Sequence, residues 1–262
     1  MSDRESIASR ILGSRKYRDL HPKVVSRQIE ELADRYDSPK ELEQVVRRKL
    51  HQAFGAYLEG NWLRKFKAGV KEMDPDQPES AVRVSRRLME LHTSTRERVG
   101  ILDDFCELIA DVIPEDSTVL DVACGLNALT LPAIRERRRL RYVGVDLHKG
   151  MVDQMALFSE AANLEAEFLW DDILSASLPE SDVAMILKLL PCLDHQGEGA
   201  ALDLIKRIQA PILLISYPTR SLGGTNVGME TNYGMQLEQL ASEAGRSVEG
   251  YTSATEAFYV LK

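Results

Sequence analysis

The chain has 262 residues, 44% of them hydrophobic and 28% charged, which predicts a soluble globular protein with one standard domain and a smaller one. Its apolar runs are shorter than the roughly 18 residues of a membrane helix, and charges within residues 1–10 exclude a secretory signal peptide, so a cytoplasmic location is expected. Three scattered cysteines exclude a disulfide framework and a zinc cluster, and the net charge of −8 excludes a uniformly basic protein.

Residues 1–78 are predicted to form a small helical domain. A helical stripe runs from Pro22 to Tyr36, with proline at its favoured first position. A capping box at Ser38 and Glu41 begins a second helix that extends to Tyr57, and a short helix covers residues 62–66. The segment 74–78 contains two prolines and is expected to be the linker to a second domain at 79–262.

The second domain alternates short β-rich runs with helical ones. A helix over 94–112 leads into it, and helices are expected at 128–138, 149–163, 197–209 and 230–244. The expected strands are 118–122, 141–146, 165–170, 183–187, 212–217, 247–251 and 256–261. Because the first five strands alternate with helices and the last two do not, we expect a seven-strand Rossmann-like α/β domain with a terminal hairpin.

Candidate cofactor residues follow the first three strands. Asp121 ends the first strand, and the small residues Ala123 and Gly125 allow a ligand to approach the backbone of the next loop. Asp146 ends the second strand, where a carboxylate can accept both ribose hydroxyls. Asp172 follows the third strand, where a carboxylate can accept a hydrogen bond from the exocyclic amine of adenine.

Each carboxylate by itself has an alternative role as a turn or capping residue at a strand end. Three of them after successive strands, with a small-residue loop after the first, favour a nucleoside cofactor. The loop lacks the full Gly-x-Gly-x-x-Gly pattern that a dinucleotide pyrophosphate requires. Adenosine without phosphates fits this site, and the sequence therefore predicts a methyltransferase that binds S-adenosylmethionine.

Further motifs are spread in order over nearly the whole chain. They are Ser14-Arg-Lys-Tyr17, Lys49-Leu-His51 with Gly55-Ala-Tyr57, Leu91-His-Thr-Ser-Thr-Arg-Glu-Arg98, Asp121-Val-Ala-Cys-Gly-Leu-Asn127, Leu187-Lys-Leu-Leu-Pro191, and Ser216-Tyr-Pro-Thr-Arg-Ser-Leu-Gly-Gly224 with Gly228-Met-Glu230. With these motifs the chain resembles the aminoglycoside-resistance 16S rRNA (guanine(1405)-N7)-methyltransferases. Ala128 departs from the proline expected in that family, and the acidic C-terminal domain is unusual for an RNA enzyme.

The resemblance implies roles for three basic residues. Arg98 would pair with the methionine carboxylate of the cofactor, the alternative being an exposed helix charge. Lys188 would lie beside the transferred methyl group, the alternative being a side chain that extends to the surface. Arg220 would hold the target base or a phosphate, the alternative being an ordinary loop charge. Leu147 and Ile173, next to two of the carboxylates, complete the predicted cofactor-binding set.

The charge of the two halves differs. Residues 1–100 contain 21 Lys and Arg against 16 Asp and Glu, whereas residues 101–262 contain 12 against 25. The helical domain is therefore expected to dock 16S rRNA in the 30S subunit, with no obligate protein partner. Solvated helix charge is the alternative for each candidate. The predicted RNA-binding residues are Arg15, Lys16, Arg18, Arg48, Lys49, Lys65 and Lys67.

Other activities remain open at this point. A small-molecule methyltransferase would not need the basic helical domain, and a methyltransferase of another rRNA atom, such as adenine N1, would share it. A non-catalytic RNA-binding module is an alternative of another class. For the guanine N7 reaction, no general base is expected, since N7 carries a free lone pair and no proton.

Overall fold

In a computed structural model, residues 3–54, 61–74, 76–193, 196–197, 199–219, 229–253 and 255–262 are described. Seven strands form one sheet in the order β3-β2-β1-β4-β5-β7-β6. The first five strands pair in parallel, and β7 pairs antiparallel with both β5 and β6. The strands are β1 Ser117–Val122, β2 Leu140–Asp146, β3 Ala166–Trp170, β4 Val183–Leu187, β5 Ile212–Pro218, β6 Val248–Thr252 and β7 Glu256–Leu261. The predicted Rossmann-like fold with a terminal hairpin is confirmed.

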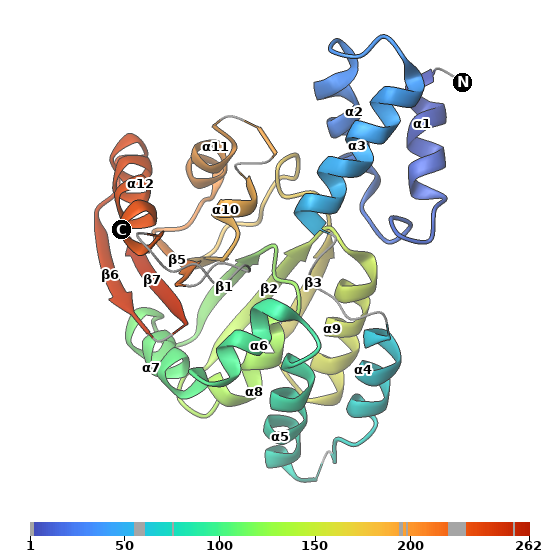
Figure 1. The fold of residues 1–262 in the computed structure, drawn as a ribbon. Coiled ribbons are helices and arrows are strands. Elements are labelled where there is room, and N and C mark those ends of the chain that lie inside the picture. Colours follow the sequence, from blue (N-terminus) through green and yellow to red (C-terminus); the bar gives the residue numbers. More distant parts are fainter. Residues whose placement is uncertain are drawn as a thin grey trace.

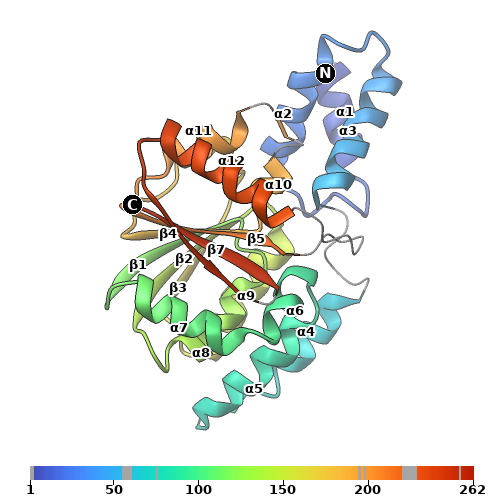
Figure 2. The same ribbon diagram turned by 60° about the vertical axis from the view of Figure 1, so that its left-hand side comes forward.

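Helices cover both faces of the sheet (Figures 1 and 2). Alternate side chains of each strand point to opposite faces, so β1 sends Val119 into one core and Leu120 into the other. Phe105 of α7 and Phe158 of α9 belong to the first core, whereas Leu204 of α11 and Leu237 of α12 belong to the second. The helices are α7 Leu102–Val112, α8 Leu131–Ile134, α9 Lys149–Ala161, α10 Leu190–Leu193, α11 Ala200–Arg207 and α12 Met229–Glu243.

Several helices differ from the sequence prediction. The helix expected over 94–112 is two helices, α6 Thr93–Val99 and α7, because the chain breaks at Gly100. The helix expected over 128–138 is a 3-10 turn at Asn127–Thr130 followed by the single-turn α8. Among the described residues, three helices were not predicted, α1 Asp3–Leu12, α5 Pro78–Met89 and the single-turn α10. The start of α5 carries a signal that predicts it, since Pro78 is at the first turn and Ala81, Val84 and Leu88 form its buried stripe.

The N-terminal helices α1, α2 Pro22–Ala33 and α3 Pro39–Phe54 have a core of their own, which includes Ile11, Ile29 and Leu50. They form a separate group beyond the carboxyl ends of β2 and β3 (Figure 1). Helix α4 Trp62–Val70 packs on α5 and α9, and its Phe66 belongs to the core of the large domain. The division at residue 78 remains a prediction, and the packing of α4 favours an earlier boundary between 54 and 61.

Across the described residues, no helix is long and apolar enough to cross a membrane. The same part of the chain contains no group of three or more His, Cys, Asp or Glu side chains arranged to hold a metal ion.

Candidate active site

The strand order reverses between β1 and β4, and open α/β sheets bind their ligands in a crevice beyond the carboxyl ends of the strands at such a point. The loop after β1 carries Ala123 and Gly125, both with left-handed backbone conformations, at φ 58° and 52°. Gly125 adopts this conformation without strain, whereas Ala123 does so at some cost. Asp146 at the end of β2 and Lys188 after β4 complete the edge of the crevice. The structure therefore brings these four predicted site residues to one edge of the sheet.

Asp146 accepts hydrogen bonds from the loop after β1 and from the start of α9, and its carboxylate can accept more. Its side chain is buried, Oδ2 accepts a 2.9 Å hydrogen bond from the Gly125 amide, and Oδ1 accepts one of 2.8 Å from the His148 amide. A carboxylate has about four lone-pair positions, so these bonds leave acceptor capacity for a ribose hydroxyl of a nucleoside. This set of donors and acceptors fits the ribose contact, which remains a prediction.

Asp121 is fully buried at the end of β1 and orients the loop from within. Its Oδ2 accepts hydrogen bonds of 2.5 Å from the Tyr142 hydroxyl and 2.7 Å from the Asn127 amide. Burial raises the pKa of Asp121 to about 6, against the opposing effect of these hydrogen bonds and of Arg98. Neither partner was predicted as a site residue: Asn127 ends the motif that begins at Asp121, and nothing in the sequence singles out Tyr142.

The raised pKa of Asp121 predicts a pH effect on stability. Its folded pKa of about 6 exceeds the ordinary value of 3.8, so the folded state binds more protons than the unfolded state between these values. The contribution of Asp121 to the free energy of unfolding therefore falls as pH rises from about 4 to 6 and stays constant above that. We expect Asp121→Asn to remove this decline. Urea unfolding of both proteins at several pH values measures it, and parallel profiles would contradict it.

Arg98 lies at the centre of a buried polar network. Its side chain is 1% exposed, and its guanidinium donates to Glu256 of β7 at 3.1 Å from Nε and 2.5 Å from Nη2. Its Nη1 donates to the Asn127 side chain at 2.5 Å. Burial acts to raise the pKa of Glu256, but the charges of Arg98 and Lys188 outweigh it and lower that pKa. Arg98 is thus not an exposed helix charge, and its contact with the methionine carboxylate stays a prediction.

Lys188 has a strained backbone and a largely buried side chain. Its φ is 56°, and its Nζ lies 2.7 Å from Glu97 of α6 and 3.5 Å from Glu256. Its side chain is 9% exposed, so it does not extend to the surface. Strain of this kind costs of order 1–3 kcal/mol and is concentrated at functional sites. Glu256 forms ion pairs with both Arg98 and Lys188, a role that the sequence did not predict.

Two of the predicted cofactor-binding residues, Asp172 and Leu147, contact the N-terminal segment. Asp172 forms an ion pair with Arg27 of α2, and the Leu147 carbonyl accepts a hydrogen bond from the His21 amide at 2.8 Å. Ile173 is buried in the second core. The adenine contact of Asp172 remains a prediction. Arg220 lies outside the described residues, so its proposed contact with the base does too.

Three further residues have contacts or pKa shifts that agree with their predicted structural roles. His148 caps α9, where its Nδ1 accepts from the Met151 amide at 3.3 Å. Burial lowers the pKa of His92 to about 4, so this imidazole is neutral at physiological pH. Burial also raises the pKa of the Cys124 thiol well above its ordinary value, which agrees with a small apolar role.

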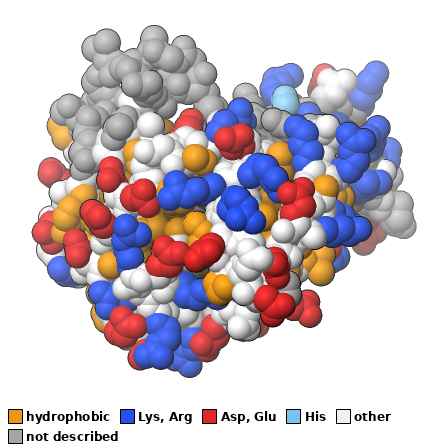
Figure 3. Space-filling model, turned by 90° about the horizontal axis from the view of Figure 1, so that it is seen from below, with side chains coloured by type: hydrophobic (Ala, Val, Ile, Leu, Met, Phe, Trp, Pro, Cys, Tyr) orange, Lys and Arg blue, Asp and Glu red, His pale blue; other side chains and the backbone are white. Residues whose placement is uncertain are grey.

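The predicted RNA-binding residues lie in three places. Arg15, Lys16 and Arg18 are exposed in the turn after α1, and the Lys16 Nζ lies 2.9 Å from the His51 Nδ1 of α3. Arg48 is exposed on α3, whereas Lys49 pairs with Glu31 at 2.9 Å. Lys65 and Lys67 are exposed on α4. On the face seen in Figure 3, Lys and Arg gather toward the right, and acidic side chains are more frequent on the left.

The fold and this strand-edge site define a Rossmann-like methyltransferase that binds S-adenosylmethionine. Residues 13–260 match the family described as Ribosomal RNA methyltransferase (FmrO), and the chain belongs to that family.

Individual relatives agree with this family over nearly their full length. The chain is 34% identical to a 16S rRNA (guanine(1405)-N(7))-methyltransferase of Proteus mirabilis, over 98% of this chain and 96% of the relative. It is 32% identical to the enzyme of the same name from Micromonospora rosea, over 98% of this chain and 96% of that relative. The crystal structure of the 16S rRNA methyltransferase RmtF with S-adenosyl-L-homocysteine is 31% identical and superposes with a TM-score of 0.87, covering 100% of this chain and 98% of that one. The predicted family is confirmed.

Proposed function

We propose that this protein transfers the methyl group of S-adenosylmethionine to N7 of guanosine 1405 in 16S rRNA. The observation that carries the proposal is the match to enzymes of this name over almost the entire chain, including the N-terminal helices. A small-molecule methyltransferase would have no need of those helices. The strand-edge site supports the proposal because Asp146 retains acceptors for a ribose.

The chemistry requires positioning more than acid or base catalysis. The N7 atom of guanine has a free lone pair, so it attacks the sulfonium methyl without losing a proton. Alignment of the reacting atoms is worth about 7–11 kcal/mol in well-oriented intramolecular reactions. Lys188 and Arg220 are the residues proposed to position the target base, which must leave the base stack to reach the crevice. The partner is proposed to be the assembled 30S subunit in the cytoplasm.

Methylation at N7 fixes a positive charge on the base and removes a hydrogen-bond acceptor from its major-groove edge. Aminoglycosides that approach this edge with ammonium groups then meet charge repulsion and lose a hydrogen bond. The proposed phenotype is high resistance to gentamicin- and kanamycin-type drugs.

The test combines an assay of methyl transfer to 30S subunits with mapping of the methylated position in 16S rRNA. Purified protein and radiolabelled S-adenosylmethionine are incubated with 30S subunits, and 16S rRNA from expressing cells is mapped by mass spectrometry. We expect label in the 30S subunit and one added methyl at N7 of guanosine 1405. A methyl on an adenine would contradict the target, and no transfer to any rRNA would favour the non-catalytic RNA-binding module.

The exposed basic residues of the helical domain lead to a prediction about docking to the 30S subunit. We expect Arg15→Ala, Arg18→Ala and Arg48→Ala together to weaken binding to 30S subunits. The slope of log affinity against log salt should fall by about one for each phosphate that the variant no longer neutralises. Affinity for S-adenosylhomocysteine should not change, because these side chains are exposed on the helical domain. A filter-binding titration at several salt concentrations measures the effect.

The matched control removes three exposed arginines beside the amino end of β2, on the edge of the sheet opposite the crevice. These are Arg137, Arg139 and Arg141. Equal losses of affinity in both triple variants would show that general charge, and not the helical domain, governs docking.

A further inference from the structure

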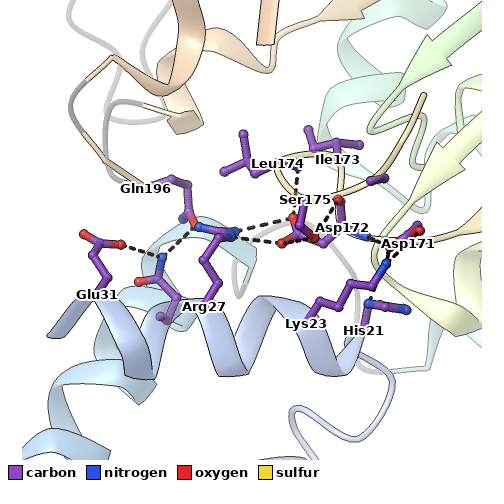
Figure 4. Close-up of polar contacts among 12 residues, drawn as sticks. His21, Lys23, Arg27, Glu31, Asp171, Asp172, Ile173, Leu174, Ser175 and Gln196 are labelled. Carbon is purple, nitrogen blue, oxygen red and sulfur yellow. Dashed lines mark hydrogen bonds and ion pairs between the residues drawn. The ribbon is translucent and has the colours of Figure 1, made fainter. Parts of the chain in front are cut away.

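The N-terminal helices are joined to the large domain by an ion pair whose carboxylate is buried and whose guanidinium is partly exposed. Arg27 of α2 directs its guanidinium at Asp172, with 2.9 Å from Nε to Oδ2 and 3.4 Å from Nη2 to Oδ1 (Figure 4). The Asp172 side chain is 1% exposed and that of Arg27 is 24% exposed. Two parallel hydrogen bonds from one guanidinium fix direction as well as distance. Arg27 therefore holds the segment after β3 in one orientation relative to α2.

Asp172 also forms hydrogen bonds within the segment after β3, so the orientation set by Arg27 extends to the residues that follow it. Its Oδ1 accepts from the Leu174 amide at 3.2 Å, and its Oδ2 accepts from the Ser175 hydroxyl at 3.4 Å. With the two bonds from Arg27, the roughly four acceptor positions of the carboxylate all have a donor, so an adenine amine would have to replace one of the two bonds of 3.4 Å. Between Asp172 and Leu174 lies Ile173, which is buried against the end of the sheet. Loss of Arg27 would leave a buried carboxylate without a counter-charge inside this segment.

The segment after β2 is tied to the same helices. The amide of Lys149 donates to the Asp19 carbonyl at 2.7 Å, and the amide of His21 donates to the Leu147 carbonyl at 2.8 Å. The Leu147 side chain packs against the core of α1–α3. Leu147 directly follows Asp146, the residue placed at the ribose. Both segments that would enclose an adenosine therefore pack on the N-terminal helices.

A second ion pair lies at the outer side of this contact. Lys23 Nζ is 2.9 Å from Asp171 Oδ1, and the two side chains are 52% and 31% exposed (Figure 4). Solvent screens a pair of this kind, so it contributes little to the attachment of α2. The two pairs lie one turn apart on α2 and on adjacent residues of the segment after β3. They differ in burial and in the cation, and Lys23 therefore serves as the exposed control for Arg27.

We propose that Arg27 is a positioning residue that couples the N-terminal helices to the adenine side of the cofactor site. In this role Arg27 acts through the segment after β3, which is predicted to contact adenine, so that cofactor binding tightens the attachment of α2 and the attached α2 strengthens cofactor binding by the same factor. On the proposed function, in which these helices dock the 30S subunit, the cofactor-loaded enzyme presents them in a fixed orientation.

The test measures binding of S-adenosylhomocysteine to the full chain by calorimetry. We expect Arg27→Ala to weaken binding at least about five-fold, the lower end of ordinary coupling between sites. Lys23→Ala should remain within about two-fold, since its pair is exposed. Arg27→Lys should fall between the wild type and Arg27→Ala, because lysine keeps the charge but not the two-pronged geometry. Arg27→Gln replaces Arg27→Ala where the latter is unstable.

A second readout separates coupling from a merely structural role. Hydrogen exchange of the α2 amides should slow when S-adenosylhomocysteine is added to the wild type, and should not respond in Arg27→Ala. Folded Arg27→Ala or Arg27→Gln with wild-type affinity and wild-type protection of α2 would overturn the proposal. Neither measurement contains RNA, so this failure would leave the guanosine 1405 assignment intact, and the mapping of 16S rRNA tests that assignment separately.

Discussion

Replacement of Glu256 by alanine is expected to lower the free energy of unfolding by about 3–5 kcal/mol, the cost of removing one partner from a buried ion pair. Arg98 is 1% exposed, and its Nε and Nη2 would both lose their acceptor. Lys188 would lose its second carboxylate, which lies 3.5 Å away. The buried Ser216 hydroxyl would also lose the oxygen to which it donates at 2.5 Å. Urea unfolding followed by circular dichroism measures the change.

Glu249 on the neighbouring strand β6 provides the control. Its carboxylate lies 3.8 Å from Lys262 Nζ, and the two side chains are 59% and 60% exposed. Glu249→Ala should therefore change the free energy of unfolding by less than about 1 kcal/mol. Equal losses of stability in the two variants, or a loss below about 1 kcal/mol in Glu256→Ala, would show that Glu256 does not hold the network together.

Replacement of Asp146 by alanine is expected to weaken binding of S-adenosylmethionine by more than about tenfold, since charge-assisted hydrogen bonds are each worth roughly 1.5–3 kcal/mol. The variant loses the acceptors that are predicted to contact the ribose. It also frees the amides of Gly125 and His148, which shape the loop after β1 and the start of α9. Calorimetry on the folded variant measures the affinity.

Two further variants show whether the loss of cofactor affinity comes from the acceptors of Asp146 itself. Asp146→Asn keeps one oxygen acceptor and should give an intermediate affinity. Asp153→Ala, on the exposed side of α9, breaks only the pair with Lys149 at 2.7 Å and should bind as the wild type does. Unchanged affinity in a folded Asp146→Ala protein would remove Asp146 from the cofactor site.

The sequence by itself determined the class of fold and the edge at which the site lies. Strand and helix periods differ, so the alternation after residue 117 predicted the parallel sheet. Because the carboxyl ends of parallel strands meet at one edge, Asp121, Gly125 and Asp146 were expected together and are found together. The motifs that include Arg98 and Lys188 predicted the family that the comparisons confirm.

Only the tertiary structure decided what these residues contact. Glu256 lies 158 positions after Arg98 in the chain, and Arg27 lies 145 positions before Asp172. Periodicity reports on neighbours within one element, and it carries no signal for a pair formed when β7 meets α6 or when α2 meets the end of β3. The burial of Glu256 and Asp172, and the nearby cations that lower the pKa of Glu256, likewise arise only when several elements exclude water from the same place.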